Sequence, residues 1–512
     1  NENNRFVDSS DFDERLFREY YSYPFYKGVT EGGSRAFMTA YNRYNGEATC
    51  GSEDLLNGIL RTEFGFDGYI VSDCGAINDI YRGHKLAGTA AEASALAVKT
   101  GTDLECGSAY RNLKEALEKK MITERELDVA LKRLFVARFR LGMFDPPEMV
   151  KWASIPYSVN DSEPNKALAA ETARKSIVLL KNDKNLLPLK KDIGKIAVIG
   201  PNADQSFVLL GNYNGNPSDP VTPLRGIREK LGSNSEVLYA QGCNWATGMT
   251  SQKPESELKA EAMEAAVKAD MVIMCMGITP RLEGEEMRVT IDGFRGGDRT
   301  RIDLPDVQQQ LIKDIHSLGK PVVLVLLNGS ALAVNWENEN IPAIIETWYG
   351  GQAAGQALAD VIFGDYNPGG RLPVTFYKSV EDLPDFSDYK MANRTYRYFT
   401  GNALYPFGYG LSYTTFKYSK LIVDKKLAAG DSVIVSVNVK NSGKMAGDEV
   451  VQLYLSNLDA QVPVPIRSLK GFKRIHLLPG ELKTITFKVS PDAFSVIDQQ
   501  NKRVILPGNF EL

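Results

Sequence analysis

The sequence predicts an α/β protein with an all-β domain at its C-terminal end. Up to about residue 400, apolar strand-like segments alternate with amphipathic helical segments, a pattern typical of parallel sheets. After about residue 413, only short alternating strands bounded by Gly, Pro and Asn remain. At 512 residues the chain has room for about three domains. We place them at residues 1–148, 176–400 and 401–512, with a linker at 149–175.

The first part, residues 1–148, alternates helix and strand signals. Helices are expected at 13–29, 52–64, 89–101 and 127–142, and strands at 35–42, 68–73 and 102–107. The last helix is the best marked. Thr123 and Glu126 form a capping-box pattern before it, and Gly142 lies where a C-terminal cap belongs. The segment "DPPEMVKW" that follows breaks the pattern, as a linker would.

The second part, residues 176–400, carries four apolar segments that predict buried strands, each ending in Gly or polar residues: 195–204, 271–279, 321–329 and 342–351. Amphipathic segments at 255–270 and 304–319 predict helices between them. The segment "VIGPNAD" resembles the opening of a dinucleotide-binding fold, but no G-x-G-x-x-G follows it, so a nucleotide site is not favoured.

The third part predicts an all-β sandwich of about 100 residues. Its alternating strands are expected at 432–443, 449–456, 482–490 and 503–512.

Composition limits the chemistry that the chain can perform. The net charge of −4 argues against a nucleic-acid-binding surface and suits a neutral substrate. No apolar run approaches the ~20 residues that span a bilayer. The five cysteines are scattered and form no C-x-x-C pair, which favours neither a disulfide framework nor a zinc site. The three histidines are far apart in the sequence, so catalysis is expected to depend on carboxylates, without a metal or cofactor.

The first candidate site lies in "GYIVSDCGAI", residues 68–77, where an apolar strand ends on Asp73. Functional groups of parallel barrels gather where strands end, and "AFMTAYNRYNG" brings Met38 and Tyr41, with Asn42 and Asn45, to the end of the preceding strand. A structural alternative is that Asp73 caps the next helix. For Met38 and Tyr41 the alternative is ordinary strand packing, and for Cys74 it is a small buried hydrophobic residue.

The second candidate site is the Gly-rich segment 277–300, "GITPRLEGEEMRVTIDGFRGGDRT". A buried strand runs directly into it, and it carries Glu283, Glu285 and Glu286. Three neighbouring carboxylates repel one another, and a partly buried one would have a raised pKa, as a general acid requires. The alternative is a solvated charged loop.

Together these segments resemble glycoside hydrolase family 3, the β-glucosidase and β-xylosidase family. The resemblance runs along the whole chain. It includes "SDC" at 72–74, "MTAYNRYNG", "KTGTDLECG", "SIVLLKNDKNLLPL", "GDYNPGGRLPVTF", "YPFGYGLSYTTF" and "SLKGFKRIHLLPGE".

The resemblance implies the fold in more detail. Residues 1–148 would be the C-terminal part of a (β/α)8-type barrel, 176–400 an α/β sandwich domain, and 401–512 a fibronectin type III-like β-sandwich. The family's barrel begins well before the segment that matches Asn1, and its earlier half carries further sugar-binding groups. We therefore expect the missing half to be supplied by the same polypeptide or a companion chain, or a homo-oligomer to cover the gap.

The resemblance also implies the roles of the site residues. Asp73 matches the catalytic nucleophile, and the acid/base falls on Glu285, with Glu283 as the nearest competitor. Tyr41 and Met38 match residues that line the pocket around the nucleophile. Cys74 takes the place of a Trp found in many β-glucosidases and is similar to the β-xylosidase-like branch, where it would form part of the pocket wall.

The implied activity is that of a retaining exo-acting β-glycosidase that forms a covalent glycosyl-Asp intermediate on an oligosaccharide or aryl glycoside. The family form favours β-xylosidase, with α-L-arabinofuranosidase as a possible companion activity, over β-glucosidase. An inactive fragment or carbohydrate-binding scaffold stays open as an alternative. The family's usual location implies export to the periplasm or the medium.

Overall fold

The computed structural model describes the chain apart from residues 1, 234, 250–251, 286, 424–427 and 429. It divides into two compact units, which we describe separately. The first comprises Asn1–Tyr157, Asp385–Lys390 and Val496–Val504, and the second comprises Ser158–Pro384, Met391–Ser495 and Ile505–Leu512. No helix among the described residues is both long and apolar enough to cross a membrane.

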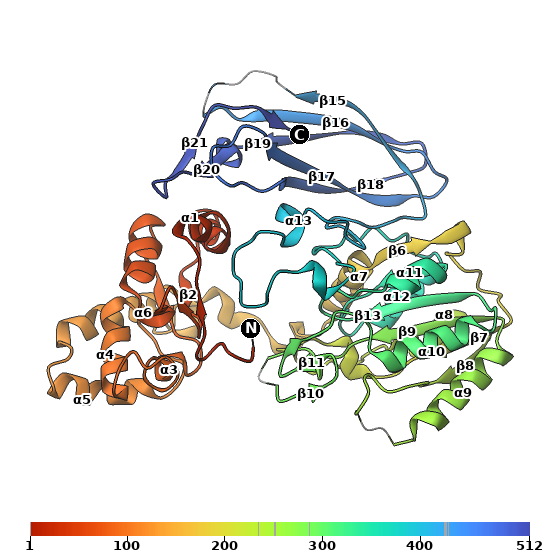
Figure 1. Ribbon diagram of the computed structural model, residues 1–512, viewed down its shortest axis with the longest axis horizontal. Coiled ribbons are helices and arrows are strands. Elements are labelled where there is room, and N and C mark those ends of the chain that lie inside the picture. The colour runs from red at the N-terminus through yellow and green to blue at the C-terminus, as the bar shows by residue number, and fades with distance from the viewer. Residues whose placement is uncertain (1, 234, 250–251, 286, 424–427, 429) are drawn as a thin grey trace. The chain divides into compact units, whose positions relative to one another are not determined.

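Parallel strand pairing with flanking helices organises the first unit (Figure 1). Strand β2 (Ala36–Met38) pairs in parallel with β5 (Tyr69–Val71), and Leu104 makes a parallel bridge to Val71. The predicted strands at 35–42, 68–73 and 102–107 are thus adjacent in that order. A small sheet of β1 (Ser9–Ser10), β3 (Arg43–Tyr44) and β4 (Glu47–Ala48) lies near the N-terminal end of the chain.

Helices account for most of the rest of this unit. They are α1 (Glu14–Leu16), η1 (Phe17–Tyr21), α2 (Tyr23–Thr30), η3 (Asp54–Glu63), α3 (Ala76–Arg82), α4 (Ala90–Thr100), α5 (Leu113–Glu118) and α6 (Glu124–Arg140). The capping box of Thr123 and Glu126 is confirmed, and Gly142 after α6 has a φ of +69°, which a C-terminal cap requires. Short turns η2 (Thr49–Gly51), η4 (Ala109–Asn112), η5 (Pro147–Met149) and η6 (Lys151–Ser154) complete it.

The second unit contains a six-stranded sheet in the order β6-β14-β13-β9-β7-β8 (Figure 1). Its strands are β6 (Val178–Asn182), β7 (Lys195–Ile199), β8 (Glu236–Ala240), β9 (Met271–Gly277), β13 (Val322–Leu327) and β14 (Ala343–Glu346). All neighbours pair in parallel except β6, which runs antiparallel to β14. The four predicted strands are confirmed as β7, β9, β13 and β14.

Helices cover both faces of this sheet, and the alternation of side chains along each strand builds one core on each face. Helices α7 (Glu163–Ser176), α8 (Pro223–Leu231) and α12 (Ala354–Ile362) share a core with Ile196 and Val198. The core on the other face contains Ala197 and Ile199. It is covered by helices α9 (Glu255–Lys268) and α10 (Asp306–His316) and by the residues that follow α11 (Asn335–Asn340). Because both faces are covered, the central strands are apolar throughout.

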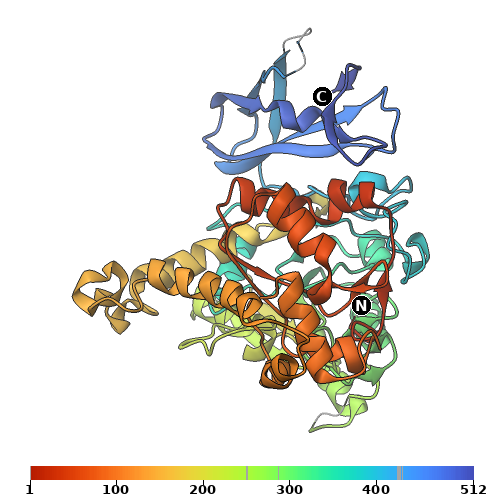
Figure 2. The ribbon, with the colours of Figure 1, turned by 90° about the vertical axis from the view of Figure 1, so that its left-hand side faces the viewer.

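A β-sandwich of two antiparallel sheets completes the second unit (Figure 2). One sheet has the order β15 (Phe416–Val423), β16 (Val433–Asn441), β19 (Leu482–Val489), and the other β18 (Ser468–Leu477), β17 (Gly447–Asn457), β22 (Phe510–Glu511). Inward-facing residues of β16, β17, β18 and β19 form its core. The α/β plus β architecture predicted from the sequence is confirmed.

Smaller elements connect these parts. They include η7 (Tyr157–Val159), η8 (Asp183–Asn185), η9 (Ser206–Leu209), η10 (Val380–Asp382), α13 (Thr395–Tyr398) and η11 (Pro491–Phe494). The loop after β9 folds into a three-stranded sheet of β10 (Thr290–Ile291), β11 (Phe294–Arg295) and β12 (Asp298–Arg299). Strands β20 (Ser495–Ile497) and β21 (Arg503–Ile505) pair with each other.

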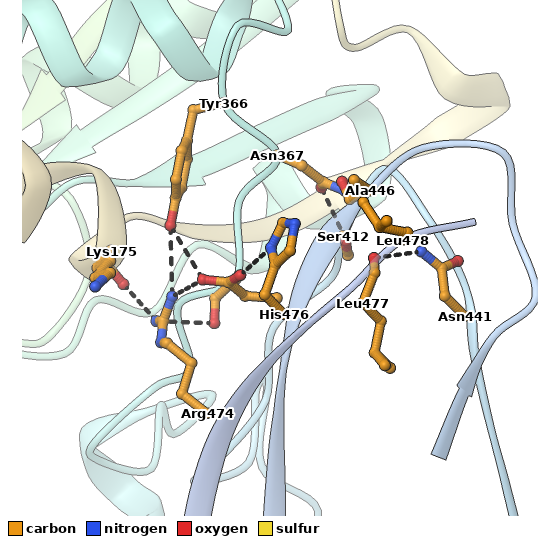
Figure 3. A network of polar contacts seen from close by, with 12 residues as sticks. Lys175, Tyr366, Asn367, Ser412, Asn441, Ala446, Arg474, His476, Leu477 and Leu478 are labelled. Atoms are coloured by element: carbon orange, nitrogen blue, oxygen red, sulfur yellow. Dashed lines mark hydrogen bonds and ion pairs between the residues drawn. The ribbon is translucent and has the colours of Figure 1, made fainter. Parts of the chain in front are cut away.

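Polar contacts join the α/β part of the second unit to the β-sandwich (Figure 3). Arg474 on β18 bonds Asp448 on β17 at 3.0 Å and the carbonyl oxygens of Lys175 and Gly369 at 2.8 and 3.1 Å. His476 lies 2.8 Å from the other oxygen of Asp448. One arginine therefore ties two strands of the sandwich to two backbone segments of the α/β part.

Candidate active site

Asp73 follows β5, at the end where parallel strands place their functional groups. One of its carboxylate oxygens accepts a hydrogen bond of 2.7 Å from the backbone N–H of Cys74. The N-cap of α3 is Gly75, and no side chain caps that helix. The alternative role of Asp73, as a helix cap, is therefore wrong, which leaves its carboxylate available for chemistry.

Cys74 is not the buried free thiol that the sequence suggested. It is exposed and forms a disulfide with Cys106. The parallel bridge between Val71 and Leu104 brings the two strand ends side by side, and Gly75 N–H then donates to the carbonyl of Cys106 at 2.7 Å. The expectation of no disulfide was wrong because the two cysteines lie 32 residues apart in sequence and meet only through strand pairing.

Tyr41 lies beside the same strand end. Its hydroxyl donates to the carbonyl oxygen of Cys74 at 3.0 Å, and the guanidinium of Arg5 lies over its ring at 4.8 Å. Buried His84 lies with Nε2 2.8 Å from the carbonyl oxygen of Tyr41. Burial lowers the pKa of His84, which favours the neutral ring. Tyr41 is thus held on both its backbone and its hydroxyl, next to the residue that follows Asp73.

Met38 is 59% exposed, so ordinary strand packing does not account for it. It lines a cavity of about 440 Å³ in the first unit whose other walls are largely aromatic and aliphatic. The two asparagines of the same segment have structural roles. Asn42 donates to the hydroxyl of Ser10, and Asn45 exchanges hydrogen bonds with the backbone of Phe12.

Asp103 is a residue that sequence reasoning missed. It is buried, accepts hydrogen bonds from Arg61 and Arg133 at 2.8 and 2.9 Å, and also accepts one from Ile70 N–H at 2.9 Å. It therefore ties the third strand segment to β5, to η3 and to α6. The motif "GTDLECG" carried the signal, since a carboxylate in a segment expected to be a strand needs partners if it is buried.

The second unit places Glu283 and Glu285 in the loop after β9. Glu283 is partly buried and accepts hydrogen bonds from the backbone of Gly329 and from the hydroxyls of Ser330 and Tyr349. Glu285 accepts a hydrogen bond from the hydroxyl of Tyr213. The two neighbouring glutamates therefore differ in surroundings. The third acid of this loop, Glu286, lies outside the described residues.

Part of this loop packs into a small apolar cluster. Leu282 and Phe294 are buried together with Ile278 and Ala246 in a separate apolar cluster. Arg281 lies over the ring of Phe207 at 3.9 Å. The alternative of a merely solvated loop is therefore wrong for the described residues around Glu283.

Sequence comparison identifies the family. Residues 4–137 match the Glycosyl hydrolase family 3 N terminal domain, residues 177–413 the Glycosyl hydrolase family 3 C-terminal domain, and residues 449–512 the Fibronectin type III-like domain. A xylan 1,4-beta-xylosidase of Xylanibacter ruminicola is 35% identical over 98% of this chain and 74% of its own length. The chain belongs to glycoside hydrolase family 3.

Other family 3 members are similar to a comparable degree. A periplasmic beta-glucosidase of Salmonella typhimurium is 36% identical over 98% of this chain and 68% of its own. Among solved structures, a beta-glucosidase from Erythrobacter marinus matches with a TM-score of 0.87 at 33% identity, covering 98% of this chain and 69% of its own. A family 3 exo-beta-xylosidase, solved with a xylobiose aziridine probe, matches with a TM-score of 0.89 at 32% identity, over 99% and 67%. The chain is thus a glycoside hydrolase by membership of the family.

Proposed function

We propose that this family 3 protein is a retaining, exo-acting β-xylosidase. Asp73 is the nucleophile that forms a covalent glycosyl intermediate, and Glu285 is the general acid/base. Support comes from the open carboxylate of Asp73 after β5 and from the similarity to a xylan 1,4-beta-xylosidase along 98% of the chain. Glu283 is the alternative acid/base.

The mechanism requires two carboxyl groups in different protonation states. Asp73 attacks the anomeric carbon as a carboxylate, and the bond from that carbon to the leaving oxygen breaks as the protonated acid donates to this oxygen. Water, deprotonated by the same glutamate, then attacks the anomeric carbon and releases Asp73. Tyr41 fixes the backbone after the nucleophile, and with Met38 and Cys74 it contributes to the sugar pocket.

The proposal is tested by measuring phenol release from aryl β-xyloside, aryl β-glucoside and aryl α-L-arabinofuranoside. We expect the xyloside to be preferred and Asp73→Asn to lower kcat/KM by at least ~10³-fold. The matched control is Asp128→Asn, which removes an exposed carboxylate on α6. Preference for the glucoside would favour β-glucosidase, as the similarity to the Salmonella enzyme suggests. No release from any substrate would indicate an inactive or carbohydrate-binding protein.

The retaining chemistry has its own test. A 2-deoxy-2-fluoro xyloside with an activated leaving group should form a stable adduct, because the fluorine slows both steps while the good leaving group keeps formation of the glycosyl-enzyme faster than its hydrolysis. Mass spectrometry of digested protein should place this adduct on Asp73. An adduct on another residue would contradict the assignment of the nucleophile.

We further propose that residues 1–148 are the C-terminal part of a (β/α)8-type barrel, followed by a linker at 149–175 and domains at 176–400 and 401–512. Among the described residues, β2 pairs only with β5, and its residues are largely exposed. Its free edge and the adjacent apolar cavity would be covered by further barrel strands or by a second copy of the chain. A well-behaved 56.6 kDa monomer in size-exclusion and intact-mass measurements would contradict this.

We also propose that the protein works in the periplasm or outside the cell. The disulfide between Cys74 and Cys106 is typical of oxidising compartments, and one relative is named as periplasmic. Fractionation of cells that produce the protein, followed by immunoblotting, tests this location. Recovery in the cytoplasm alone, with both thiols reduced, would contradict it.

A further inference from the structure

Three donors meet at one carboxylate in the second unit. The backbone N–H of Gly329 and the hydroxyl of Tyr349 each donate to Oε1 of Glu283 at 2.6 Å, and the hydroxyl of Ser330 donates to Oε2. Glu283 follows β9, while the donors follow β13 and β14. The contacts therefore tie the loop after β9 to the ends of the two neighbouring strands of the sheet.

A second contact closes the same loop at its far end. Arg299 on β12 donates to the hydroxyl oxygen of Ser330 at 3.0 Å and to the carbonyl oxygens of Ala331 and Asp303 at 2.8 and 3.2 Å. Ser330 thus accepts from Arg299 and donates to Glu283. Both ends of the segment 283–299 are held at one point, and Glu285 lies within it.

Burial raises the pKa values of two groups beside Glu283. Burial, reinforced by the charge of Glu283, raises the pKa of Tyr349 well above its usual value, so its hydroxyl stays protonated and remains a donor. Fully buried Glu346, at the end of β14, has its pKa raised to about 8, mainly by burial and in part by Glu283. Both of these groups therefore keep their protons at neutral pH.

Glu346 stabilises the backbone just before Tyr349, one of the donors to Glu283. Its carboxyl oxygens accept from the backbone N–H of Trp348 at 2.8 Å and from the side chain of Asn328 at 3.0 Å. Trp348 has a φ of +59°, a strained value for a residue with a side chain. Glu346 therefore stabilises the turn that presents Tyr349 to Glu283.

We infer that Glu283 is a positioning residue that fixes the loop and thereby Glu285, with Tyr349 and Ser330 as its hydrogen-bond donors. Both carboxylate oxygens of Glu283 already accept hydrogen bonds from the protein itself, whereas a general acid must direct a proton at the leaving oxygen of the substrate. Gly284 links the two glutamates, and a Cβ there would lie 2.5 Å from the side chain of Asn212, so the link has little room to shift. This inference rests on the proposed function, in which Glu285 transfers the proton.

The first experiment separates proton transfer from positioning by its dependence on the leaving group. Glu285→Gln should retain activity on dinitrophenyl glycosides, whose leaving group needs no proton, and lose it on alkyl glycosides. Added azide should restore its turnover and yield a glycosyl azide. Glu283→Gln and Tyr349→Phe should lower kcat on both substrate classes by a similar factor, roughly 10- to 100-fold for the loss of a charged hydrogen bond, without azide rescue.

The second experiment needs no activity. Hydrogen–deuterium exchange of peptides covering 278–301 should be roughly 10- to 100-fold faster in Glu283→Gln, Tyr349→Phe and Ser330→Ala than in the unaltered chain. Glu285→Gln should leave it unchanged. Matched controls are Glu236→Gln and Tyr239→Phe, both on the edge strand β8 away from this loop.

The outcomes are distinguishable. Azide rescue of Glu283→Gln but not of Glu285→Gln would make Glu283 the acid/base and overturn the inference, while the retaining mechanism would stand. Unchanged exchange in both Glu283→Gln and Tyr349→Phe would also overturn it. If the unaltered chain cleaves no glycoside, the proposed function fails, but the exchange measurement still decides whether Glu283 anchors the loop.

Discussion

Cys74, the residue after Asp73, is covalently bonded to Cys106, which follows the next strand segment. The bond links two adjacent loops at the strand ends. Tyr41 contacts the same place, since its hydroxyl bonds the carbonyl oxygen of Cys74. The backbone that carries Asp73 is thus restrained from two sides, which is the support that its proposed role as nucleophile requires.

We expect loss of this disulfide to destabilise the first unit. Replacing both cysteines by serine should lower the free energy of unfolding by about 2–4 kcal/mol, because the unfolded chain regains the freedom of the closed loop. Urea unfolding of the double variant measures this change. Thiol titration of denatured protein provides the check on the assignment: three thiols before reduction and five after it. Five thiols before reduction would contradict the disulfide.

Asp103 should be essential for the stability of the same unit. Asp103→Asn removes the charge that compensates two guanidinium groups, and breaking such a buried pair costs about 3–5 kcal/mol. Asp67→Asn is the control, because Asp67 pairs with Arg35 at the exposed surface, where an ion pair contributes at most about 1 kcal/mol. Chemical denaturation should therefore show a much larger loss of stability for Asp103→Asn than for Asp67→Asn. Equal losses would show that the ion pairs of Asp103 contribute no more than an exposed pair.

Glu346 should make stability depend on pH. Its pKa is 4.5 when unfolded and about 8 in the folded protein, so the folded protein binds the extra proton between these values. The free energy of unfolding should therefore fall as the pH rises from about 4.5 to about 8, by at most about 1.4 kcal/mol per pH unit.

Glu346→Gln should remove this part of the pH dependence, since an amide is neutral at every pH. Urea unfolding at several pH values across the window provides the measurement. Glu339→Gln, an exposed glutamate, should leave the slope as it is. A slope that persists in Glu346→Gln would assign the titration to another group.

The contacts of Asp448 should hold the β-sandwich to the α/β part of the second unit (Figure 3). Burial alone would raise the pKa of Asp448, but hydrogen bonds from His476 and Arg474 outweigh it and lower the pKa below its usual 3.8. The ionised Asp448 therefore contributes to folding stability above that pH, and its contribution is lost as the pH falls below it. Acid should thus weaken the contact.

Asp448→Asn should weaken the same contact at neutral pH, by about 1–3 kcal/mol for a hydrogen-bonded charge. Limited proteolysis near residues 400–416 should become faster, because the two parts separate more often. The control is Asp431→Asn, which removes an exposed carboxylate in the sandwich. Equal proteolysis of both variants would mean that apolar packing alone holds the two parts together.

Much of the fold could be predicted from local patterns. The central strands β7, β9, β13 and β14 are apolar throughout because helices cover both faces, and that signal is readable in a single sequence. The edge strands β6 and β8 were not predicted as strands, since β8 carries the mixed pattern "EVLYA" and its identity depends on pairing with β7. Pairing between distant segments leaves little local trace.

By itself, the sequence determined the layered architecture, the family and the two acidic segments, because periodicity and motifs are local properties of a chain. Only the tertiary structure decided which side chains meet. Strand pairing placed Cys74 beside Cys106. The parallel strands β9, β13 and β14 end on the same side of the sheet, which brought Tyr349 and Ser330 to Glu283. These contacts join residues 32 to 66 positions apart, so their energies depend on the folded geometry and not on the residues adjacent in the sequence.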